Sequence, residues 1–351
     1  MPEKVRCAVI GAGGIGLEHL QKLAQCPQAS VVALAESNME RAKIASDKFR
    51  VSRSYADYHD LLDQPDIDAV TVALPNYLHA PVAIEALEAR KHVLLEKPMA
   101  VNGKEAAQVV MTAKKMKRIL MVNQQFRFKR QTQIAKQVVD RGDLGEIYHA
   151  RCFWLRRSNI PRIGSWFTQK QFAGGGCTID LGVHVLDACL HLIGDFKVNS
   201  VSAHSFSKFG PRGLGEGDWG KSEINPKRPF DVEDSSIALL RCAGGRTILL
   251  EVSWAGHHAS ESRECGIDLL GSTASLSLYP ARLFRPGAMG YETVELASPK
   301  VPYGEEPAHH FIQCIVEGKR PLVALEESLE VQLILDAIYA SAACGKEVRL
   351  R

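Results

Sequence analysis

The sequence contains no long hydrophobic run and no strong excess of charge of one sign. Its 43 Lys and Arg residues stand against 40 Asp and Glu residues, which leaves a net charge of +3. This balance argues against a nucleic-acid-binding protein. No apolar run approaches the ~20 residues that a membrane-spanning helix needs. We therefore expect neither a nucleic acid nor a membrane among the partners of this protein.

Closely spaced cysteines are also absent, because the nine cysteines are scattered and form no C-x-x-C pair. Cys7, Cys189 and Cys314 lie in apolar surroundings, so we interpret them as buried thiols and expect neither a disulfide framework nor a zinc site. The sequence Met-Pro-Glu-Lys leads directly into an apolar run and lacks the pattern of a signal peptide. These features predict a cytoplasmic protein.

The chain changes its texture near residue 125. Before that point short apolar strands alternate with helices, as in a doubly wound parallel sheet that is covered on both faces. After it the strands are longer and alternate with period two, as in an antiparallel sheet. The 351 residues suit two such domains better than one. We predict an α/β protein with domains at 1–125 and 126–351, the second built on a large, mostly antiparallel open sheet.

The expected elements follow from these periodicities. Strands of the first domain are expected at Val5–Ile10, Val31–Ala35, Ala69–Ala73, Val93–Leu95 and Leu120–Val122, and helices at Met39–Phe49, Tyr58–Leu62, Pro81–Ala89 and Glu105–Lys117. Strands of the second domain are expected at Tyr148–Leu155, Ser200–Ser205, Ser236–Arg241, Thr247–Trp254, Cys265–Leu270 and Ala274–Leu278. Its helices are expected at Gln131–Arg141, Thr178–Leu192 and Glu327–Cys344, and a surface loop at Pro211–Lys227.

The first strand ends in a glycine-rich turn, Gly-Ala-Gly-Gly-Ile-Gly, which leads into a helix. Gly11 permits the tight turn, Gly13 lets a pyrophosphate approach the backbone, and Gly16 lets the helix pack closely on the strand. The open N–H groups at the start of the helix then face the phosphates. The alternative is an ordinary strand–helix turn with an acid at the end of the next strand by chance.

The second strand ends at Glu36, ~20 residues after the last glycine, where a dinucleotide-binding turn has an acid for the ribose 2′-hydroxyl. A carboxylate there accepts from NAD and repels the 2′-phosphate of NADP. Ser37 and Asn38 follow, and Arg41 lies about one helical turn further on, from where it could still swing in. The pattern favours NAD over NADP.

Gly11, Glu36, Pro75 and Lys97 all fall at carboxyl ends of parallel strands, so we expect them to converge at one edge of the sheet. An amine at Lys97, next to an oxidised nicotinamide ring, would have a lowered pKa and could share or relay a proton. The following Pro98 could lock this turn, conceivably as a cis peptide. The alternative for Lys97 is a solvated lysine at a strand end.

Three glycines, Gly174 to Gly176, open a helix that carries Asp180 and His184 four residues apart, on one face. A carboxylate beside an imidazole orients it, fixes its tautomer and stabilises its protonated form. His184 is therefore a candidate base for a hydroxyl proton. The alternatives are a structural pair in the core or half of a metal site, and no further ligand lies at suitable spacing for a metal.

The stretch from Trp154 to Trp166 combines aromatic and guanidinium side chains, with arginines at positions 156, 157 and 162. Aromatic rings stack on the apolar face of a sugar, and guanidinium groups donate forked hydrogen bonds to its hydroxyls. The stretch could also be an interface or a surface loop.

Taken together, these motifs resemble the Gfo/Idh/MocA family of oxidoreductases, named after glucose–fructose oxidoreductase and inositol dehydrogenase. The resemblance spans nearly the whole chain: Gly11–Gly16, Leu74-Pro75-Asn76…His79, Glu96-Lys97-Pro98, Asn123…Arg127, Gly174-Gly175-Gly176…Asp180-x-x-x-His184 and Ser341-Ala342…Gly345-Lys346-Glu347-Val348. It implies a Rossmann domain, a second domain whose open sheet builds homodimers or homotetramers, and the catalytic set Lys97, Asp180 and His184.

The motifs and the resemblance together give two candidate binding sets. The cofactor set is Gly11, Gly13, Gly14, Ile15, Gly16, Glu36, Ser37, Arg41, Leu74, Pro75, Asn76, His79, Glu96, Lys97, Pro98 and Gln125. The substrate set is Lys97, Arg127, Trp154, Arg156, Arg157, Trp166, Asp180 and His184. No metal is expected.

The resemblance implies NAD-dependent, reversible oxidation of a secondary hydroxyl of a sugar, glycoside or cyclitol such as inositol to the ketone. In that scheme His184 takes the hydroxyl proton, Asp180 orients His184, and Lys97 stabilises the alkoxide. Two alternatives use the same residues or the same fold. One is a redox-neutral lyase or glycosidase that retains its NAD, and the other is a sugar sensor without catalysis.

Overall fold

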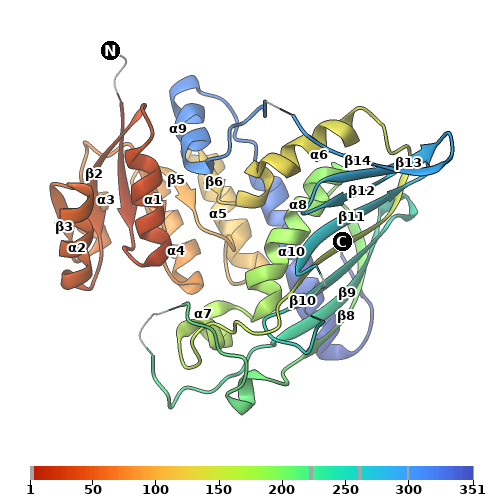
Figure 1. Ribbon diagram of the computed structural model, residues 1–351. Helices are drawn as coiled ribbons and strands as arrows, with labels where there is room; N and C mark the ends of the chain where they lie inside the picture. The colour runs from red at the N-terminus through yellow and green to blue at the C-terminus, as the bar shows by residue number, and fades with distance from the viewer. Residues whose placement is uncertain (1–3, 221–223, 260–262, 299, 351) are drawn as a thin grey trace. The chain divides into compact units, whose positions relative to one another are not determined.

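The computed structural model describes residues 4–220, 224–259, 263–298 and 300–350, and the chain divides into two compact units (Figure 1). The first unit comprises Met1–Asn123 and Glu306–Leu329, and the second comprises Gln124–Glu305 and Glu330–Arg351. The chain therefore returns to the first unit after strand β14 (Gly290–Glu295) and then re-enters the second unit, a crossing that a single division at residue 125 does not contain.

The first unit is built on a six-stranded parallel sheet with the order β3-β2-β1-β4-β5-β6. Its strands are β1 (Val5–Ile10), β2 (Ala29–Ala35), β3 (Arg53–Tyr55), β4 (Ala69–Val72), β5 (His92–Leu95) and β6 (Leu120–Val122). Its helices are α1 (Gly14–Ala24), α2 (Met39–Phe49), α3 (Tyr58–Leu62), α4 (Asn76–Glu88), α5 (Gly103–Met116) and α9 (Pro307–Glu317). The prediction of a doubly wound parallel sheet is confirmed.

Helix α4 begins earlier than predicted. We expected a helix over Pro81–Ala89. It begins at Asn76, with Pro75 as the residue before the first turn and Pro81 inside the helix. The prediction was wrong because a proline inside a helix loses a single hydrogen bond, which burial of the surrounding side chains can offset.

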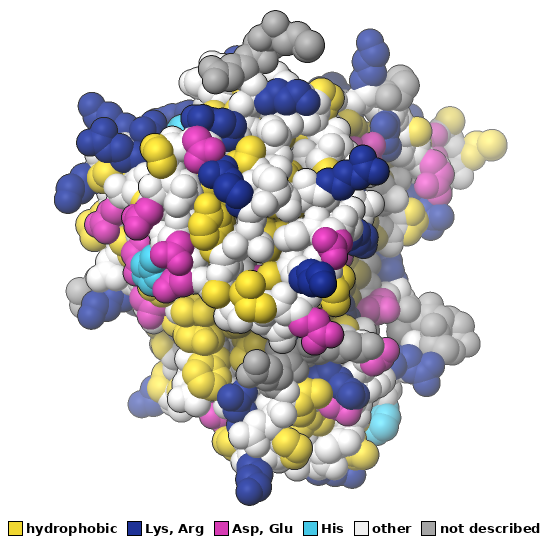
Figure 2. Space-filling view, turned by 90° about the vertical axis from the view of Figure 1, so that its left-hand side faces the viewer, with side chains coloured by type: hydrophobic (Ala, Val, Ile, Leu, Met, Phe, Trp, Pro, Cys, Tyr) yellow, Lys and Arg dark blue, Asp and Glu magenta, His cyan; other side chains and the backbone are white. Residues whose placement is uncertain are grey.

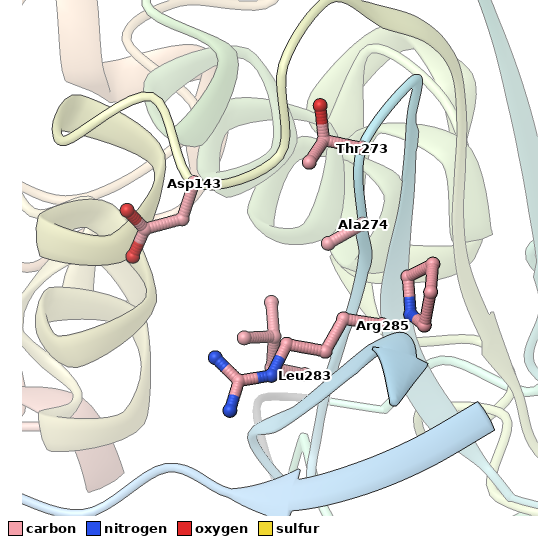
Figure 3. A pocket seen from close by; sticks show the side chains of 6 residues that line it. Asp143, Thr273, Ala274, Leu283 and Arg285 are labelled. Carbon is pink, nitrogen blue, oxygen red and sulfur yellow. The ribbon is translucent and has the colours of Figure 1, made fainter. Parts of the chain in front are cut away.

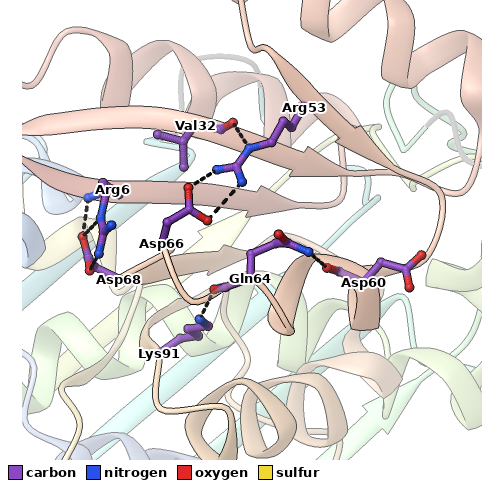
Figure 4. A network of polar contacts seen from close by, with 8 residues as sticks. All are labelled: Arg6, Val32, Arg53, Asp60, Gln64, Asp66, Asp68 and Lys91. Carbon is purple, nitrogen blue, oxygen red and sulfur yellow. Dashed lines mark hydrogen bonds and ion pairs between the residues drawn. The ribbon is translucent and has the colours of Figure 1, made fainter.

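Ion pairs tie together the amino ends of the strands in this sheet (Figure 4). Arg6 of β1 forms a forked pair with Asp68 just before β4, and Arg53 of β3 forms one with Asp66. The hydrogen bonds from Arg6 lower the pKa of Asp68, against the effect of its partial burial. These pairs lie at the amino edge of the sheet. The glycine turn follows the end of β1 and therefore lies at the opposite, carboxyl edge.

The second unit contains a nine-stranded sheet with the order β14-β13-β12-β11-β7-β10-β9-β8-β15. Its strands are β7 (Ile147–Leu155), β8 (Val198–Phe206), β9 (Ser235–Cys242), β10 (Thr247–Ser253), β11 (Cys265–Gly271), β12 (Ser275–Leu278), β13 (Arg282–Gly287), β14 (Gly290–Glu295) and β15 (Val348–Arg349). All neighbours are antiparallel except β7 and β10. The predicted, mostly antiparallel sheet is confirmed.

One face of this sheet is covered by helix α8 (Val183–Ile193), which packs on β7 and β11 and contacts α6 (Arg130–Asp140). Alternate residues of β9 and β10 that face the core, such as Leu240 and Leu250, are fully buried. The remaining helical segments are η1 (Gln125–Phe128), η2 (Trp166–Thr168), α7 (Lys170–Ala173), a π-helical turn η3 (Thr178–Gly182), η4 (Gly210–Arg212), η5 (Ala243–Gly245) and α10 (Leu325–Cys344).

The structure shows where an apolar stretch of the chain, its surface charges and its cysteines lie. Residues Lys170–Ile193 are long and apolar enough to cross a membrane, but 94% of the relevant window is buried inside the protein, so this stretch serves as a core helix. On the face shown in Figure 2, basic and acidic side chains are both present among apolar ones, in keeping with the small net charge. All nine cysteines are free thiols, and Cys7, Cys189 and Cys314 are buried as expected.

Candidate active site

The glycine turn between β1 and α1 leaves an open surface at the start of the helix. Gly11 has φ +94°, and a Cβ on Gly16 would lie 1.9 Å from the carbonyl oxygen of Gly11, so both positions require glycine. A Cβ on Gly13 or Gly14 would meet nothing within 4 Å, and no side chain caps the helix. Ile15 is 49% exposed. This surface fits a pyrophosphate that accepts from the helix N–H groups.

Glu36 lies at the carboxyl end of β2 and is buried against the turn. Its Oε2 accepts from the N–H of Ala12 at 2.9 Å, and its Oε1 accepts from Arg41 at 2.8 Å. Burial opposes its ionisation, but the hydrogen bonds from Arg41, Asn38 and Ala12 lower the pKa of the carboxyl. Arg41 has thus swung toward the acid, while Ser37 is exposed beside it.

The turns after β4 and β5 are joined by a buried imidazole. The two ring nitrogens of His79 each lie 2.7 Å from a carbonyl oxygen, one of Leu74 and the other of Pro98. Burial lowers the pKa of His79. Asn76 is also buried, and Pro75, between Leu74 and Asn76, is half-buried. This contact fixes the spacing between the two turns at the carboxyl edge of the sheet.

The carboxylate of Glu96 is the centre of a buried polar cluster. It accepts from the side chain of Asn123 at 2.6 Å and lies 2.7 Å from Nε2 of His19 on α1. Burial opposes its ionisation, but the hydrogen bond with His19 helps to lower its pKa. Lys97 follows, half-buried, and its peptide bond to Pro98 is cis. The cluster therefore anchors the backbone that carries the Lys97 amine.

The segment that carries Asp180 and His184 is held at its start by a buried carboxylate. Glu233 accepts from the N–H groups of Gly176 and Thr178, each at 2.9 Å, and from the hydroxyl of Tyr339 at 3.0 Å. A Cβ on Gly176 would lie 1.9 Å from the carbonyl oxygen of Glu233. Burial, together with the Glu233 charge, raises the pKa of Tyr339. Glycine is thus required at Gly176 by the close approach of Glu233, at Gly175 by that of the Tyr339 hydroxyl, and at Gly174 by its φ of +84°.

Asp180 lies in the π-helical turn, and His184 follows in the first turn of α8. The indole N–H of Trp254 donates to Asp180 at 2.9 Å. The ring of His184 is stacked on Phe126, with centroids 5.0 Å apart, and contacts Trp154 at 5.9 Å. Both Asp180 and His184 are buried. The result is an imidazole clustered with two aromatic rings, which also contact each other at 5.5 Å, close along the chain to a carboxylate that is oriented by an indole.

Arg127 occupies a different place from the other candidate substrate residues. Its guanidinium forms a forked pair with Asp187, at 2.8 and 2.6 Å, and both side chains have no exposed surface. It also lies over the ring of Phe196. These contacts give Arg127 a structural role, and we do not propose it as a contact to the substrate. Gln125, by contrast, is exposed in η1.

The remaining candidates come from the stretch after β7. Trp154 donates to Glu264 at 3.1 Å, and the Arg156 guanidinium lies 4.8 Å from the ring centroid of Trp154. Trp166 stacks on Phe167. Arg157 is exposed. Trp154 and Arg156 thus lie together with His184, whereas Trp166 joins them through other aromatic rings.

A cavity of about 410 Å³ lies elsewhere, at the edge formed by β12, β13 and the end of α6 (Figure 3). Its lining residues are Asp143, Thr273, Ala274, Leu283, Arg285 and Pro286, none of which belongs to the candidate sets. Arg285 is already paired with Glu292. Among the described residues, no cluster of His, Cys, Asp and Glu suitable for a metal ion is found.

Several residues of the site were not singled out from the sequence. They are His19, Phe126, Trp254, Glu233 and Tyr339, which reach the predicted residues only through the tertiary fold. The glycine run next to Asp180 was the one local signal, since glycines that are not in a turn indicate a close approach of another chain segment.

Comparison with known proteins agrees with this arrangement. Residues 5–124 match the family described as "Oxidoreductase family, NAD-binding Rossmann fold", and residues 132–277 match the "GFO/IDH/MocA C-terminal domain". The chain is 31% identical to D-glucoside 3-dehydrogenase of Escherichia coli, over 99% of this chain and 97% of that protein. It is 29% identical to levoglucosan dehydrogenase of Pseudarthrobacter phenanthrenivorans, over 97% of both chains.

The fold is similar as well. The structure of a levoglucosan dehydrogenase in complex with NADH and levoglucosan superposes with a TM-score of 0.86, at 27% identity over 99% of both chains. An open glycine turn, a buried acid after the second strand and full-length likeness to named dehydrogenases lead to the same conclusion. The chain belongs to the Gfo/Idh/MocA family of oxidoreductases with an NAD-binding Rossmann domain.

Proposed function

We propose that this enzyme oxidises a secondary hydroxyl of a sugar or glycoside to the ketone, reversibly and with NAD. The observation that carries the proposal is the buried imidazole of His184, packed against the rings of Phe126 and Trp154, in a chain whose Rossmann sheet has an open dinucleotide-binding edge. The relatives named D-glucoside 3-dehydrogenase, levoglucosan dehydrogenase and inositol 2-dehydrogenase support a sugar, glycoside or cyclitol as substrate.

Each candidate catalytic residue has a distinct task in this proposal. His184 accepts the hydroxyl proton, and its aromatic neighbours restrict the orientation of the imidazole. Asp180, held by Trp254, balances the charge that His184 gains. Lys97 donates a hydrogen bond to the alkoxide that forms. When bound, NAD supplies the hydride acceptor.

The residues that would hold NAD are those at the carboxyl edge of the parallel sheet. The backbone at Gly13, Gly14 and Ile15 faces the pyrophosphate, and Glu36 accepts from the adenosine ribose. The turns at 74–76 and 96–98, fixed to each other by His79, border the nicotinamide. In this proposal the exposed Gln125 is a further contact to the cofactor.

An absorbance screen at the NADH band tests the function. Inositols, aldoses and glycosides are offered with NAD and with NADP. We expect NADH to form with at least one glycoside. Purified protein that retains NAD tightly and forms no net NADH with any polyol would contradict the proposal and favour the redox-neutral lyase or glycosidase. Protein that binds a sugar but neither forms NADH nor changes the sugar would favour a sensor.

Glu36→Ala is expected to weaken NAD binding and to relax the preference for NAD over NADP by about 10-fold or more. The carboxylate that repels a 2′-phosphate is lost, and Arg41 is released to pair with one. The lowered pKa keeps this carboxyl ionised, so the NAD preference should persist until the pH falls through that lowered value. Glu40→Ala, which removes an exposed acid next to Arg41 on α2, is the control. An unchanged ratio of cofactor affinities in Glu36→Ala would remove Glu36 from this role.

We further propose that the face of the large sheet opposite α8 joins two copies of the chain. Ile237 is 44% exposed on this face, and half-buried Leu239 and Leu249 lie opposite each other in neighbouring strands. Half-exposed apolar side chains on a sheet face indicate an interaction surface. The pair Arg151–Glu251, between β7 and β10, and the pair Arg263–Asp268, at β11, can add polar contacts.

Ile237→Arg is expected to shift the protein to monomers in light-scattering measurements on a sizing column, because two guanidinium groups would meet in the buried centre of a twofold interface. Ile44→Arg, at an exposed isoleucine of α2, should leave the mass unchanged. A wild-type protein that is monomeric at all concentrations would contradict this proposal.

A further inference from the structure

An aromatic ridge runs from His184 across the second unit. We define it by Trp154, Arg156, Trp219, Phe167 and Trp166. The Arg156 guanidinium lies 4.8 Å from the Trp154 centroid and 5.6 Å from that of Trp219. Phe167 contacts Trp219 edge-on at 5.1 Å and stacks on Trp166 at 3.8 Å. Each of these side chains is half-buried, so the ridge keeps a surface that a ligand can cover.

Hydrogen bonds between two loops hold Trp219 in this position. The N–H groups of Asn159 and Ile160 both donate to the carbonyl of Gly215, and that of Arg162 donates to Trp219 itself. The indole N–H of Trp219 donates back to the carbonyl of Asn159 at 2.9 Å. Residues 215–219, in the stretch predicted to be a surface loop, are therefore hydrogen-bonded to residues 159–162. Trp219 is thus a fixed part of the ridge.

Two arginines, Arg156 in the ridge and Arg162 in the neighbouring loop, have buried donors that lack an acceptor among the described residues. Nη1 of Arg156 is buried and has no hydrogen-bond partner there, and the same is true of Nε of Arg162. The Nε of Arg156 lies 3.5 Å from a carboxylate oxygen of Glu264. A buried donor without a partner costs free energy. The Arg156 side chain is 15% exposed, so a ligand oxygen can reach its guanidinium from that side, and a small shift of the side chain would then pair the buried donor.

The surrounding charges narrow the chemistry of that ligand. Glu264 lies beside Arg156, and Glu216 lies 3.7 Å from a guanidinium nitrogen of Arg162, so an anionic group would meet two carboxylates. An apolar group would cover the rings but leave the Arg156 donor unpaired. A neutral sugar ring satisfies both demands, since its C–H face stacks on indole and its hydroxyl oxygens accept from guanidinium.

We propose that the ridge binds a second sugar ring, next to the ring that is oxidised, so that the natural substrate is a disaccharide or a larger glycoside. The inference rests on the proposed function, because it takes His184 to mark the reacting ring. Trp154 contacts both His184 and Arg156 and is shared between the two rings. Arg156 and Trp219 then determine specificity for the second ring.

The test compares a glucose disaccharide with methyl glucoside as substrates of the complete enzyme. We expect kcat/KM to be about 10-fold or more higher for the disaccharide, as for one added stacking contact and one hydrogen bond. Trp219→Ala and Arg156→Met should each reduce this ratio by about 5- to 100-fold. Trp219→Phe should restore most of it, and Arg212→Ala, an exposed arginine in the Trp219 loop, is the control.

A binding measurement provides a second readout that does not depend on turnover. Calorimetric titration of the disaccharide into the protein should show the same loss of affinity in Trp219→Ala as the kinetic ratio. Equal kcat/KM for the two substrates in the wild type, or a ratio that Trp219→Ala leaves unchanged, would overturn the inference while the proposed function stands. Absence of NADH with both sugars, when the wider screen finds another substrate, would also overturn the inference, whereas absence of NADH with every compound of the screen would overturn the proposed function.

Discussion

Replacement of His184 by alanine is expected to lower turnover with the best sugar substrate by a factor of ~10²–10⁴, which is the usual contribution of a positioned general base. The affinity for NAD should stay near that of the wild type, because His184 takes no part in the contacts proposed for the dinucleotide. The two quantities are measured by steady-state kinetics and by a fluorescence titration with NADH.

The reason for so large an effect is the setting of the imidazole. His184 is 4% exposed and is packed against Phe126 and Trp154, so its imidazole is held in one place, and alanine removes the group that accepts the hydroxyl proton in the proposed reaction. His59→Ala is the matched control, since His59 is exposed on α3 and belongs to none of the candidate sets. Turnover within a few-fold of the wild type in His184→Ala would remove His184 from the mechanism.

Loss of Asp187 is expected to be the most damaging single change to the stability of the second unit. In Asp187→Ala the guanidinium of Arg127, with no exposed surface, would remain buried without its carboxylate. Breaking a buried pair in this way typically costs about 3–5 kcal/mol. We therefore expect a lower urea midpoint and a lower thermal midpoint of unfolding.

The chain offers a convenient probe for this measurement, because all four tryptophans lie in the second unit. Tryptophan fluorescence thus reports the unfolding of that unit separately. The double variant Arg127→Met, Asp187→Leu should recover most of the loss, since apolar side chains can replace a buried pair. Glu295→Ala, in an exposed pair with Arg282, should change the midpoint little. A midpoint in Asp187→Ala equal to that of Glu295→Ala would contradict the assignment.

The first sheet could be predicted from sequence because its strands are short apolar runs with clear ends. The runs that end at Ile10, Ala35 and Leu95 coincide with strand ends in the structure. Strands β13 and β14 were missed, since they are largely exposed and show no alternation of apolar and polar residues. Helix α9 was missed as well, although Pro307 at its start and Gly318 at its end are typical boundary residues.

The candidate site was predictable where residues lie close together in the sequence. The glycine turn and Glu36 have a fixed spacing, and the structure joins them through Ala12. The partners of Asp180 and Glu96 were not predictable, because Trp254 and His19 lie 74 and 77 residues away along the chain. Arg127 shows the same limit in the opposite direction, since only the fold reveals that Asp187 occupies its guanidinium.

The transfer of hydrogen from sugar to cofactor tests the central claim most directly. A glycoside with deuterium at its carbinol carbons is incubated with the enzyme and NAD, and the nicotinamide C4 position is examined by nuclear magnetic resonance. We predict one deuterium at C4 for each ketone formed, with a strongly reduced rate in His184→Ala. Protein that binds NAD but gives no deuterated cofactor with any glycoside or inositol would contradict the account.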